Sequence, residues 1–228
     1  MKNIIQLLFT FVLVSINAQK LESDTLLKKT TDIEEVVIND KDYEKVDYSF
    51  ALKKEINFRL KSVNPYSAYE LGLKFKNSLQ QKGRISNVIL YLHKTESNVN
   101  LTNLEINFYK MNPLTNVPDE KLNTQKIIYI PKNKNRGQIK INVENFHIPF
   151  PEEGVLVSVK WLPNEFKDKS VGPAIRLTNY TERLTYVTFD NDMTKWNNGF
   201  NFSKKQGVYT NVMIGLEVYV KKRKSNNE

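Results

Sequence analysis

The chain has 228 residues, a formal net charge of +9 at pH 7, 40% hydrophobic residues and no cysteine. Its length allows one large domain or two small ones, and its hydrophobic content is ordinary for a globular chain. The missing cysteines exclude a disulfide-stapled fold, a cysteine nucleophile and a lipoprotein anchor, which requires a cysteine just after the signal core.

Residues 1–18, MKNIIQLLFTFVLVSINA, have the pattern of a secretory signal peptide. A single positive charge, Lys2, precedes an apolar stretch from Ile4 to Val14, and small or polar residues lead to Ala18. The apolar stretch is shorter than the roughly 20 residues that span a bilayer, and no later stretch approaches that length. We therefore expect an exported protein without a transmembrane segment, in the periplasm or at the cell surface of a bacterium with an outer membrane.

Residues 19–52 read as an acidic, extended leader. They carry five Lys against nine Asp or Glu, and no long amphipathic pattern. Within TTDIEEVVIND, residues 30–40, an apolar run stands among acidic neighbours; its members are Ile33, Val36, Val37 and Ile38. This run could dock as an added strand on a periplasmic partner, or it could be a linker remnant or an extra edge strand. The second interpretation is the favoured one, because such short patterns are degenerate.

Downstream of Lys53 the apolar residues alternate with polar ones, which is typical of half-buried β-strands. Residues 53–228 carry 28 basic against 16 acidic residues, so the composition changes here as well. Pro, Gly and Asn separate the alternating runs. In chain order these runs are Ile56 to Leu60, Tyr69 to Phe75, Val88 to Leu92, Leu104 to Phe108, Ile128 with Ile130, Ile139 to Val143, Val155 to Trp161, Ile175 with Leu177, Leu184 to Thr188, and Val212 to Val220.

These runs predict an all-β domain over residues 53–224, followed by a polar tail at 225–228. The spacings are mostly too short for the crossovers that parallel strands need, so we expect antiparallel pairing. The architecture that fits is a two-sheet β-sandwich or jelly roll of about ten strands.

Four stretches resemble the β-sandwich part of bacterial carboxypeptidase-like regulatory-domain proteins, a family exported to the periplasm. The stretches are INFRLKSVNPYSAYELGLKFK, GRISNVILYLHKT, LEINFYKMNPLTNVPDEKL and VENFHIPFPEEGVLVSVKWLP, which together span roughly residues 55–200. The family pattern is matched at Phe108, Tyr109, Pro118, Val143, Phe146, Ile148, Pro151 and Trp161. The resemblance implies the fold rather than a function, and residues 19–52 are too few for the regulatory module that precedes the sandwich in the family.

The apolar run at residues 33–38 resembles the TonB box of outer-membrane nutrient receptors, which pairs as an added strand with an energy-transducing partner. The receptor barrel itself needs many more lipid-facing strands than this chain can supply. The resemblance therefore implies a vestige of a docking segment.

Known catalytic and metal-binding patterns are missing from the sequence. The two histidines, His93 and His147, are far apart and lack ligand spacing, so we expect both to be structural and no metal or other cofactor to be bound. There is no Gly-x-Ser-x-Gly elbow and no phosphate-cradling glycine loop. The basic residues are scattered singly along strands, which argues against nucleic acid as a partner. The basic run from Lys221 to Lys224 reads as a charged flank that suppresses aggregation.

The most suggestive stretch is DNDMTKWNNGFNFSKKQG, residues 190–207. Aromatic rings stand there beside side-chain amides, a combination that suits a sugar or peptide ligand; the candidate binding residues are Trp196, Asn197, Asn198, Phe200 and Phe202. The alternative is that the rings plug the open end of the sandwich, and this alternative is favoured. Asp190 to Asp192 read as a turn rather than as a Ca²⁺ site.

Two functions from different classes remain. The first is a non-catalytic β-sandwich module that binds a protein or a glycan. The second is a carbohydrate-active enzyme with paired carboxylates, such as Glu152 with Glu153 or Asp190 with Asp192. Neighbouring carboxylates on one strand would point to opposite faces, which weakens the first pair.

Overall fold

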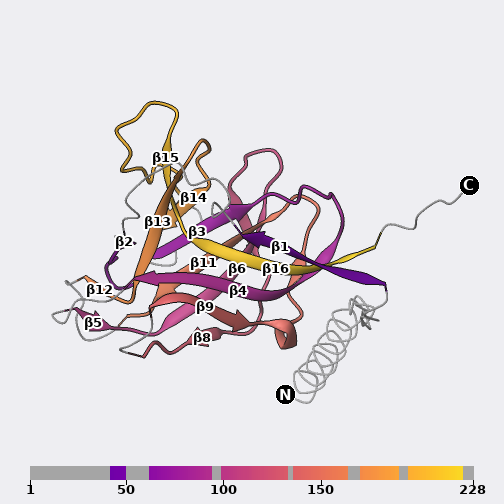
Figure 1. The fold of residues 1–228 in the computed structure, drawn as a ribbon, viewed down its shortest axis with the longest axis horizontal. Coiled ribbons are helices and arrows are strands. Elements are labelled where there is room, and N and C mark those ends of the chain that lie inside the picture. The colour runs from indigo at the N-terminus through magenta and orange to yellow at the C-terminus, as the bar shows by residue number, and fades with distance from the viewer. Residues whose placement is uncertain are drawn as a thin grey trace, which may run out of the picture. The chain divides into compact units, whose positions relative to one another are not determined.

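The computed structural model describes residues 42–49, 62–93, 99–132, 136–163, 170–189 and 195–222. In these ranges the chain is all-β, with sixteen strands and one 3-10 helix, η1 (Glu144–Phe146). Two large antiparallel sheets contribute to one apolar core, which confirms the expected β-sandwich (Figure 1). No helix in the described ranges is long and apolar enough to cross a membrane.

The first sheet is built around β4, an eleven-residue strand. Its order is β1 (Tyr43–Ser49), β16 (Ile214–Lys221), β4 (Gly83–His93), β13 (Ala174–Tyr180) and β15 (Tyr209–Val212). Three shorter strands complete this sheet: β9 (Gly137–Asn142) and β10 (Pro149–Phe150) pair with β4, and β2 (Ser62–Val63) pairs with β13.

The second sheet carries the candidate functional site. Its order is β14 (Thr185–Thr188), β3 (Glu70–Phe75), β11 (Val155–Trp161), β6 (Leu104–Met111) and β7 (Pro118–Lys121), with β8 (Ile127–Tyr129) also paired to β6. A separate parallel pair joins β5 (Asn100–Leu101) to β12 (Val171–Gly172).

The core follows from the alternation in the sequence, with one exception in β4. Alternate residues of β3, β6 and β11 face the core, as the period of two requires. In β4 both Ile85 and Val88 are core residues although three positions separate them. The register between β4 and β16 shifts next to Glu217, so Ser86 is an extra residue at a β-bulge. The bulge changes which residues of β4 face inward.

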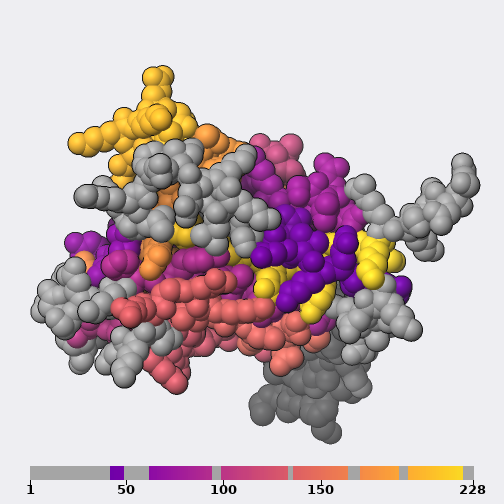
Figure 2. Space-filling view, viewed as in Figure 1, coloured from indigo at the N-terminus to yellow at the C-terminus, as the bar shows by residue number. Residues whose placement is uncertain are grey.

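The structured region begins earlier than the boundary expected at residue 53. Residues 43–49, which the acidic composition assigned to a weakly packed leader, form β1 and pair with β16 over all seven residues. Figure 1 shows the first and last described strands side by side, and in Figure 2 the indigo atoms of β1 lie against the yellow atoms of β16. Charged side chains on the solvent face of an edge strand do not prevent pairing through its backbone, which is why composition misplaced this strand.

The alternation around residue 128 was assigned to the wrong face. Ile128 and Ile130 were expected to mark the buried side of a strand, but they are 40% and 67% exposed, and Ile127 is buried at 3%. Ile127 pairs with Ile106 of β6, and this pairing turns it toward the core. A shift of one residue exchanges the two faces of a strand, so a short apolar run does not define its own register.

The strands missing from the expected set of about ten are mostly short. β2, β5, β10 and β12 have two residues each, which is too few to show a period. The expected run from Ile56 to Leu60 lies outside the described residues.

Candidate functional site

Residues 196–198 form a strap along the edge of the second sheet. The backbone of Asn197 bridges to Val187 of β14 through two hydrogen bonds, Val187 N to Asn197 O at 2.8 Å and Asn197 N to Val187 O at 2.9 Å. The strap therefore extends the sheet beyond β14. It brings Trp196 and Asn198 to the outer face of that sheet, away from the main core.

The ring of Trp196 completes a small outer aromatic cluster. The indole packs edge-on against Tyr109, with ring centroids 5.3 Å apart and planes at 69°. The cluster also contains Met111, Leu156 and Tyr186, all of which are buried. Gly72 pairs with Tyr186 across β3 and β14, and a Cβ on Gly72 would stand 2.7 Å from Leu156 Cδ2. A glycine at this position leaves room for the Leu156 side chain.

A ring of polar groups, which we call the amide rim, surrounds the hydroxyl of Tyr186. The rim consists of Lys74, Asn116, Tyr186 and Asn198. The Tyr186 hydroxyl donates to the carbonyl oxygen of Asn116 at 2.6 Å, and the Asn116 amide nitrogen lies 3.3 Å from the same hydroxyl. The Asn198 side chain also hydrogen-bonds Tyr186, and Lys74 Nζ donates to Asn116 Oδ1. These residues come from β3, β14, the strap and the turn that precedes β7.

That turn holds Asn116 in a fixed position. Asn112 Oδ1 accepts from the backbone N–H groups of Leu114 and Thr115 at 2.9 and 3.1 Å, and Asn116 N donates to Asn112 O at 2.8 Å. Asn116 itself has φ of 57°, a left-handed conformation that asparagine tolerates better than most residues. The amide of Asn116 is thus positioned by backbone contacts before any ligand arrives.

Burial changes the acid–base properties of the rim. It raises the pKa of the Tyr186 hydroxyl, although the hydrogen bond from Asn198 acts in the opposite direction. It also lowers the pKa of Lys74, and the nearby charge of Lys76 adds to this effect. The tyrosine therefore stays protonated at neutral pH and presents a hydroxyl rather than a phenolate.

Below the aromatic cluster, Glu70 is the centre of a buried hydrogen-bond network. One of its carboxylate oxygens, Oε1, accepts from Tyr109 Oη at 2.9 Å, from Asn107 Nδ2 at 3.0 Å and from Ser158 Oγ. Glu70 is 3% exposed, and its three donors are equally buried. Burial and the negative charge of Glu70 raise the pKa of Tyr109 far above its ordinary value, so Tyr109 remains a donor.

Charged residues continue this network across the sheet. The register places Lys160 opposite Glu70 on one side and opposite Glu105 on the other, and Thr188 opposite Glu70 on β14. Glu105 also accepts from Lys121 Nζ at 3.2 Å. The residues placed opposite one another by this register are all buried; they are Thr188, Glu70, Lys160 and Glu105.

Two buried polar atoms on this face have no hydrogen-bond partner among the described residues. They are the indole nitrogen Nε1 of Trp196, a donor, and the side-chain oxygen Oδ1 of Asn107, an acceptor. Buried polar groups in native structures are nearly always paired, so these two atoms are exceptions on this face. The indole belongs to the strap that carries Asn198 of the rim.

The rest of the predicted binding loop lies elsewhere. Phe200 packs against the main core, and its ring centroid is 4.9 Å from that of Phe202, which is 56% exposed. The backbone N–H and C=O of Asn197 are hydrogen-bonded to Val187, and its side-chain oxygen Oδ1 accepts from Gly199 N. Of the five residues singled out by sequence, the structure thus places Trp196 and Asn198 beside Tyr186, whereas Phe200 and Phe202 contact each other elsewhere. Lys74, Asn116 and Tyr186 gave no signal because they are single residues of separate segments.

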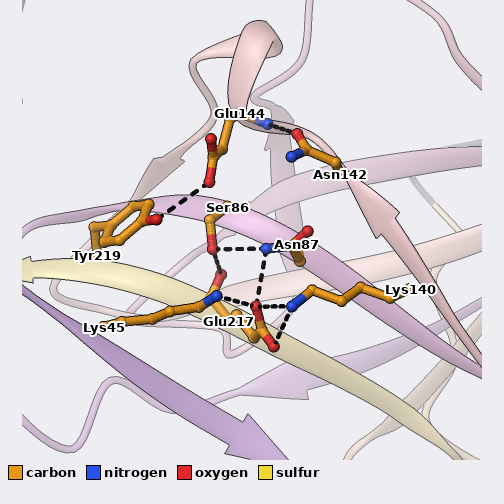
Figure 3. Close-up of polar contacts among 8 residues, drawn as sticks. All are labelled: Lys45, Ser86, Asn87, Lys140, Asn142, Glu144, Glu217 and Tyr219. Atoms are coloured by element: carbon orange, nitrogen blue, oxygen red, sulfur yellow. Dashed lines mark hydrogen bonds and ion pairs between the residues drawn. The ribbon is translucent and has the colours of Figure 1, made fainter.

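A second polar network, on the first sheet, ties strands together (Figure 3). Glu217 of β16 forms ion pairs with Lys45 of β1 at 2.6 Å and with Lys140 of β9 at 2.8 Å, and it accepts from Asn87 Nδ2 at 2.9 Å. Ser86, the bulge residue, donates to the Glu217 backbone oxygen at 3.1 Å. Every group in this network is engaged by a neighbouring strand, and we interpret it as structural.

The remaining candidates from the sequence are dispersed. His93 ends β4, and His147 follows η1, where its Nδ1 lies 3.1 Å from Arg84 Nη1. Glu152 and Glu153 are exposed in the turn before β11, not on a strand. No group of three or more His, Asp or Glu that could hold a metal ion occurs among the described residues.

Several expectations fall outside the described residues. These are the signal peptide, the docking run at Ile33, Val36, Val37 and Ile38, the Asp190 to Asp192 turn and the polar tail.

The chain matches no protein-family model, no curated protein and no solved structure.

Proposed function

We propose that the protein is an exported, non-catalytic β-sandwich module that binds a glycan at the amide rim. The observation that supports this function is the convergence of amide, hydroxyl and ammonium groups from four separate segments around Tyr186 Oη. A sugar presents hydroxyl groups that both donate and accept. Asparagine amides match both roles, and lysine adds a donor.

The aromatic cluster beneath the rim supports the same proposal. Trp196, two residues before Asn198, has an indole donor without a partner among the described residues, and the buried ring of Tyr186 lies beneath the rim. Ligand sites commonly combine aromatic surface with a small number of positioned polar groups. A protein ligand, the other partner class considered from sequence, is less favoured because Asn116 and Asn198 form a polar rim without an exposed aromatic anchor.

The enzymatic alternative has weaker support. The two carboxylates that the register places nearest to one another on this face, Glu70 and Glu105, are 3% and 7% exposed. Glu70 is occupied by three donors and Glu105 by Lys121. Carboxylates that act on a glycosidic bond must reach it from both sides, which burial at this depth opposes.

Tryptophan fluorescence can test the proposal, because the chain has two tryptophans and Trp161 is fully buried in the main core. In a Trp161→Phe background, oligosaccharides released from the producing cell's envelope are titrated against the protein while Trp196 emission is followed. We expect saturable binding that weakens about tenfold in Asn198→Ala and in Asn116→Ala, a loss typical of hydrogen bonds at a polar site.

Asn142→Ala is the matched control, because Asn142 is an exposed asparagine on β9 of the other sheet. It should bind as the parent does. Equal affinity of all three asparagine variants, or no saturable response to any envelope oligosaccharide fraction, would show that the rim is not a glycan site.

A further inference from the structure

Three aromatic side chains form an exposed platform at one end of the second sheet, where β3 begins and β14 ends. They are Tyr66, Tyr69 and Phe189. Tyr66 is 51% exposed and Phe189 is 45% exposed, while Tyr69 packs against the main core between them. The ring centroids of Tyr66 and Tyr69 are 6.1 Å apart, and those of Tyr69 and Phe189 are 4.0 Å apart.

The backbone holds the two tyrosines of this aromatic platform in place. Residues 66–69 form a turn closed by Tyr69 N donating to Tyr66 O at 3.3 Å. Ala68 N donates to Trp161 O at 2.8 Å, and Trp161 N donates to Tyr69 O at 3.0 Å, so the end of the turn that leads into β3 is tied to β11. At the other end, Tyr66 forms an isolated β-bridge with Ser170. These contacts fix the ring positions without a ligand.

Ala68 adopts a conformation that alanine rarely takes. Its φ is 69°, in the left-handed region, where a non-glycine residue costs roughly 1 kcal/mol. Such strain persists where the surroundings enforce it, and it is frequent at ligand-binding positions. Here the strained residue separates the two tyrosines that form one side of the platform.

The platform is separate from the amide rim. Tyr69, which directly precedes β3, and Lys74 within it are five residues apart, about 16 Å in extended chain, and an odd separation places their side chains on opposite faces of the sheet. Binding at one site can therefore be lost without loss at the other.

We propose that the aromatic platform is a second binding surface, and that it takes a single, twisted polysaccharide chain. The negative face of an aromatic ring attracts the polarised C–H groups on the face of a pyranose, and the ring buries that apolar face. The ring planes are tilted by 45° between Tyr66 and Tyr69 and by 84° between Tyr69 and Phe189. A flat crystalline polymer needs coplanar rings, whereas successive sugars of a twisted chain present faces at different angles.

The tyrosine hydroxyls add polar contacts to the stacking. Burial raises the pKa of Tyr69, and the neighbouring Tyr66 adds to this effect, so the Tyr69 hydroxyl stays protonated at neutral pH. A tyrosine hydroxyl can donate to and accept from a sugar hydroxyl beside the stacked ring.

Native affinity electrophoresis of the full chain tests this proposal. The gels contain hydroxyethylcellulose, xylan or laminarin as soluble single-chain probes, and microcrystalline cellulose serves as the flat probe in a sedimentation assay. We expect retardation by at least one soluble probe and no sedimentation with the flat one. Tyr66→Ala and Phe189→Ala should each weaken binding to the soluble probe about tenfold.

Two further variants separate stacking from folding. Tyr66→Phe keeps the ring face and should bind within about twofold of the parent. Ile130→Ala removes an exposed aliphatic side chain after β8 and should bind as the parent does. Thermal melting of each variant shows whether the fold is retained.

Four outcomes would overturn the proposal. They are no retardation by any of the three soluble probes, parental retardation of both alanine variants, sedimentation with the flat probe in place of retardation, and ring-dependent capture of an envelope protein without polysaccharide binding. Each outcome is read independently of Asn116 and Asn198, so failure at the platform is distinguishable from failure at the rim.

Discussion

At the scale of single residues, the outer face of the second sheet depends on Glu70. One oxygen of this buried carboxylate satisfies three buried donors, on Asn107, Tyr109 and Ser158. A buried charge is tolerated when several hydrogen bonds compensate for its lost hydration. The position of Tyr109, and with it the support for Trp196, therefore depends on this carboxylate.

A double-mutant cycle measures that dependence. Glu70→Ala should lower the free energy of unfolding by about 3 kcal/mol, because three buried donors lose their acceptor. Tyr109→Phe should cost about 1 kcal/mol in the parent protein and nearly nothing in the Glu70→Ala background. Urea unfolding followed by circular dichroism gives all four values. Additive effects would mean that the tyrosine hydroxyl and the carboxylate are not coupled.

At the scale of elements, β1 is the strand whose assignment changed most between sequence and structure. It has acidic and basic residues on its solvent side, but Val46 and Tyr48 pack against the main core. The ring centroid of Tyr48 is 5.3 Å from that of Phe150 in β10. The strand is therefore an integral edge of the first sheet, although its composition resembles that of a leader.

Limited trypsin digestion can show this directly. Cleavage after Lys45 should be much slower in the folded protein than in a synthetic peptide of residues 39–52, because β1 is hydrogen-bonded along its length and Lys45 is paired with Glu217. Tyr48→Ala should restore cleavage and lower the free energy of unfolding by about 2 kcal/mol. Mass spectrometry of the time course identifies the site. Equal cleavage rates for protein and peptide would show that β1 is not stably paired with the sheet.

At the scale of the whole molecule, one ion-pair network joins distant parts of the chain. Glu217 on β16 links β1, at the start of the described residues, to β9, in the middle of the sequence. Burial raises the pKa of Glu217, but hydrogen bonds and charges of Lys140 and Lys45 outweigh it, and the net effect is a pKa below the ordinary value of 4.5. Stability gained from this carboxylate is therefore present above its unfolded pKa and is lost as the pH falls through the folded one.

Glu217→Gln should reveal this contribution in the pH dependence of unfolding. At pH 7 the variant should be less stable than the parent, and the difference should shrink as the pH falls below about 4.5 and disappear once the parent carboxylate is protonated. Chemical unfolding at several pH values measures the difference. Glu152→Gln, an exposed glutamate in a turn, serves as control and should show no comparable trend. A difference that grows toward low pH would contradict the assignment.

Part of the candidate site was visible in the sequence. Trp196 and Asn198 stood out because a ring and an amide occur close together in a polar stretch. Asn116 and Tyr186 did not, because each is an ordinary residue of its own segment and they meet only when β14 lies beside β3 and the turn before β7 folds over. The same limit hid the aromatic platform, where Tyr66 and Phe189 are far apart in the chain.

The sequence by itself determined the fold class, because the period of two is a local property: in Val155 to Trp161 it marked the strand that the structure shows. The tertiary structure decided strand order, the pairing of β1 with β16, the buried face of β8 and the composition of the rim. Backbone donors and acceptors are the same at every residue, so a strand's own sequence does not identify its partner. That choice is made by the packing of distant side chains into one core, which exists only after the strands have assembled.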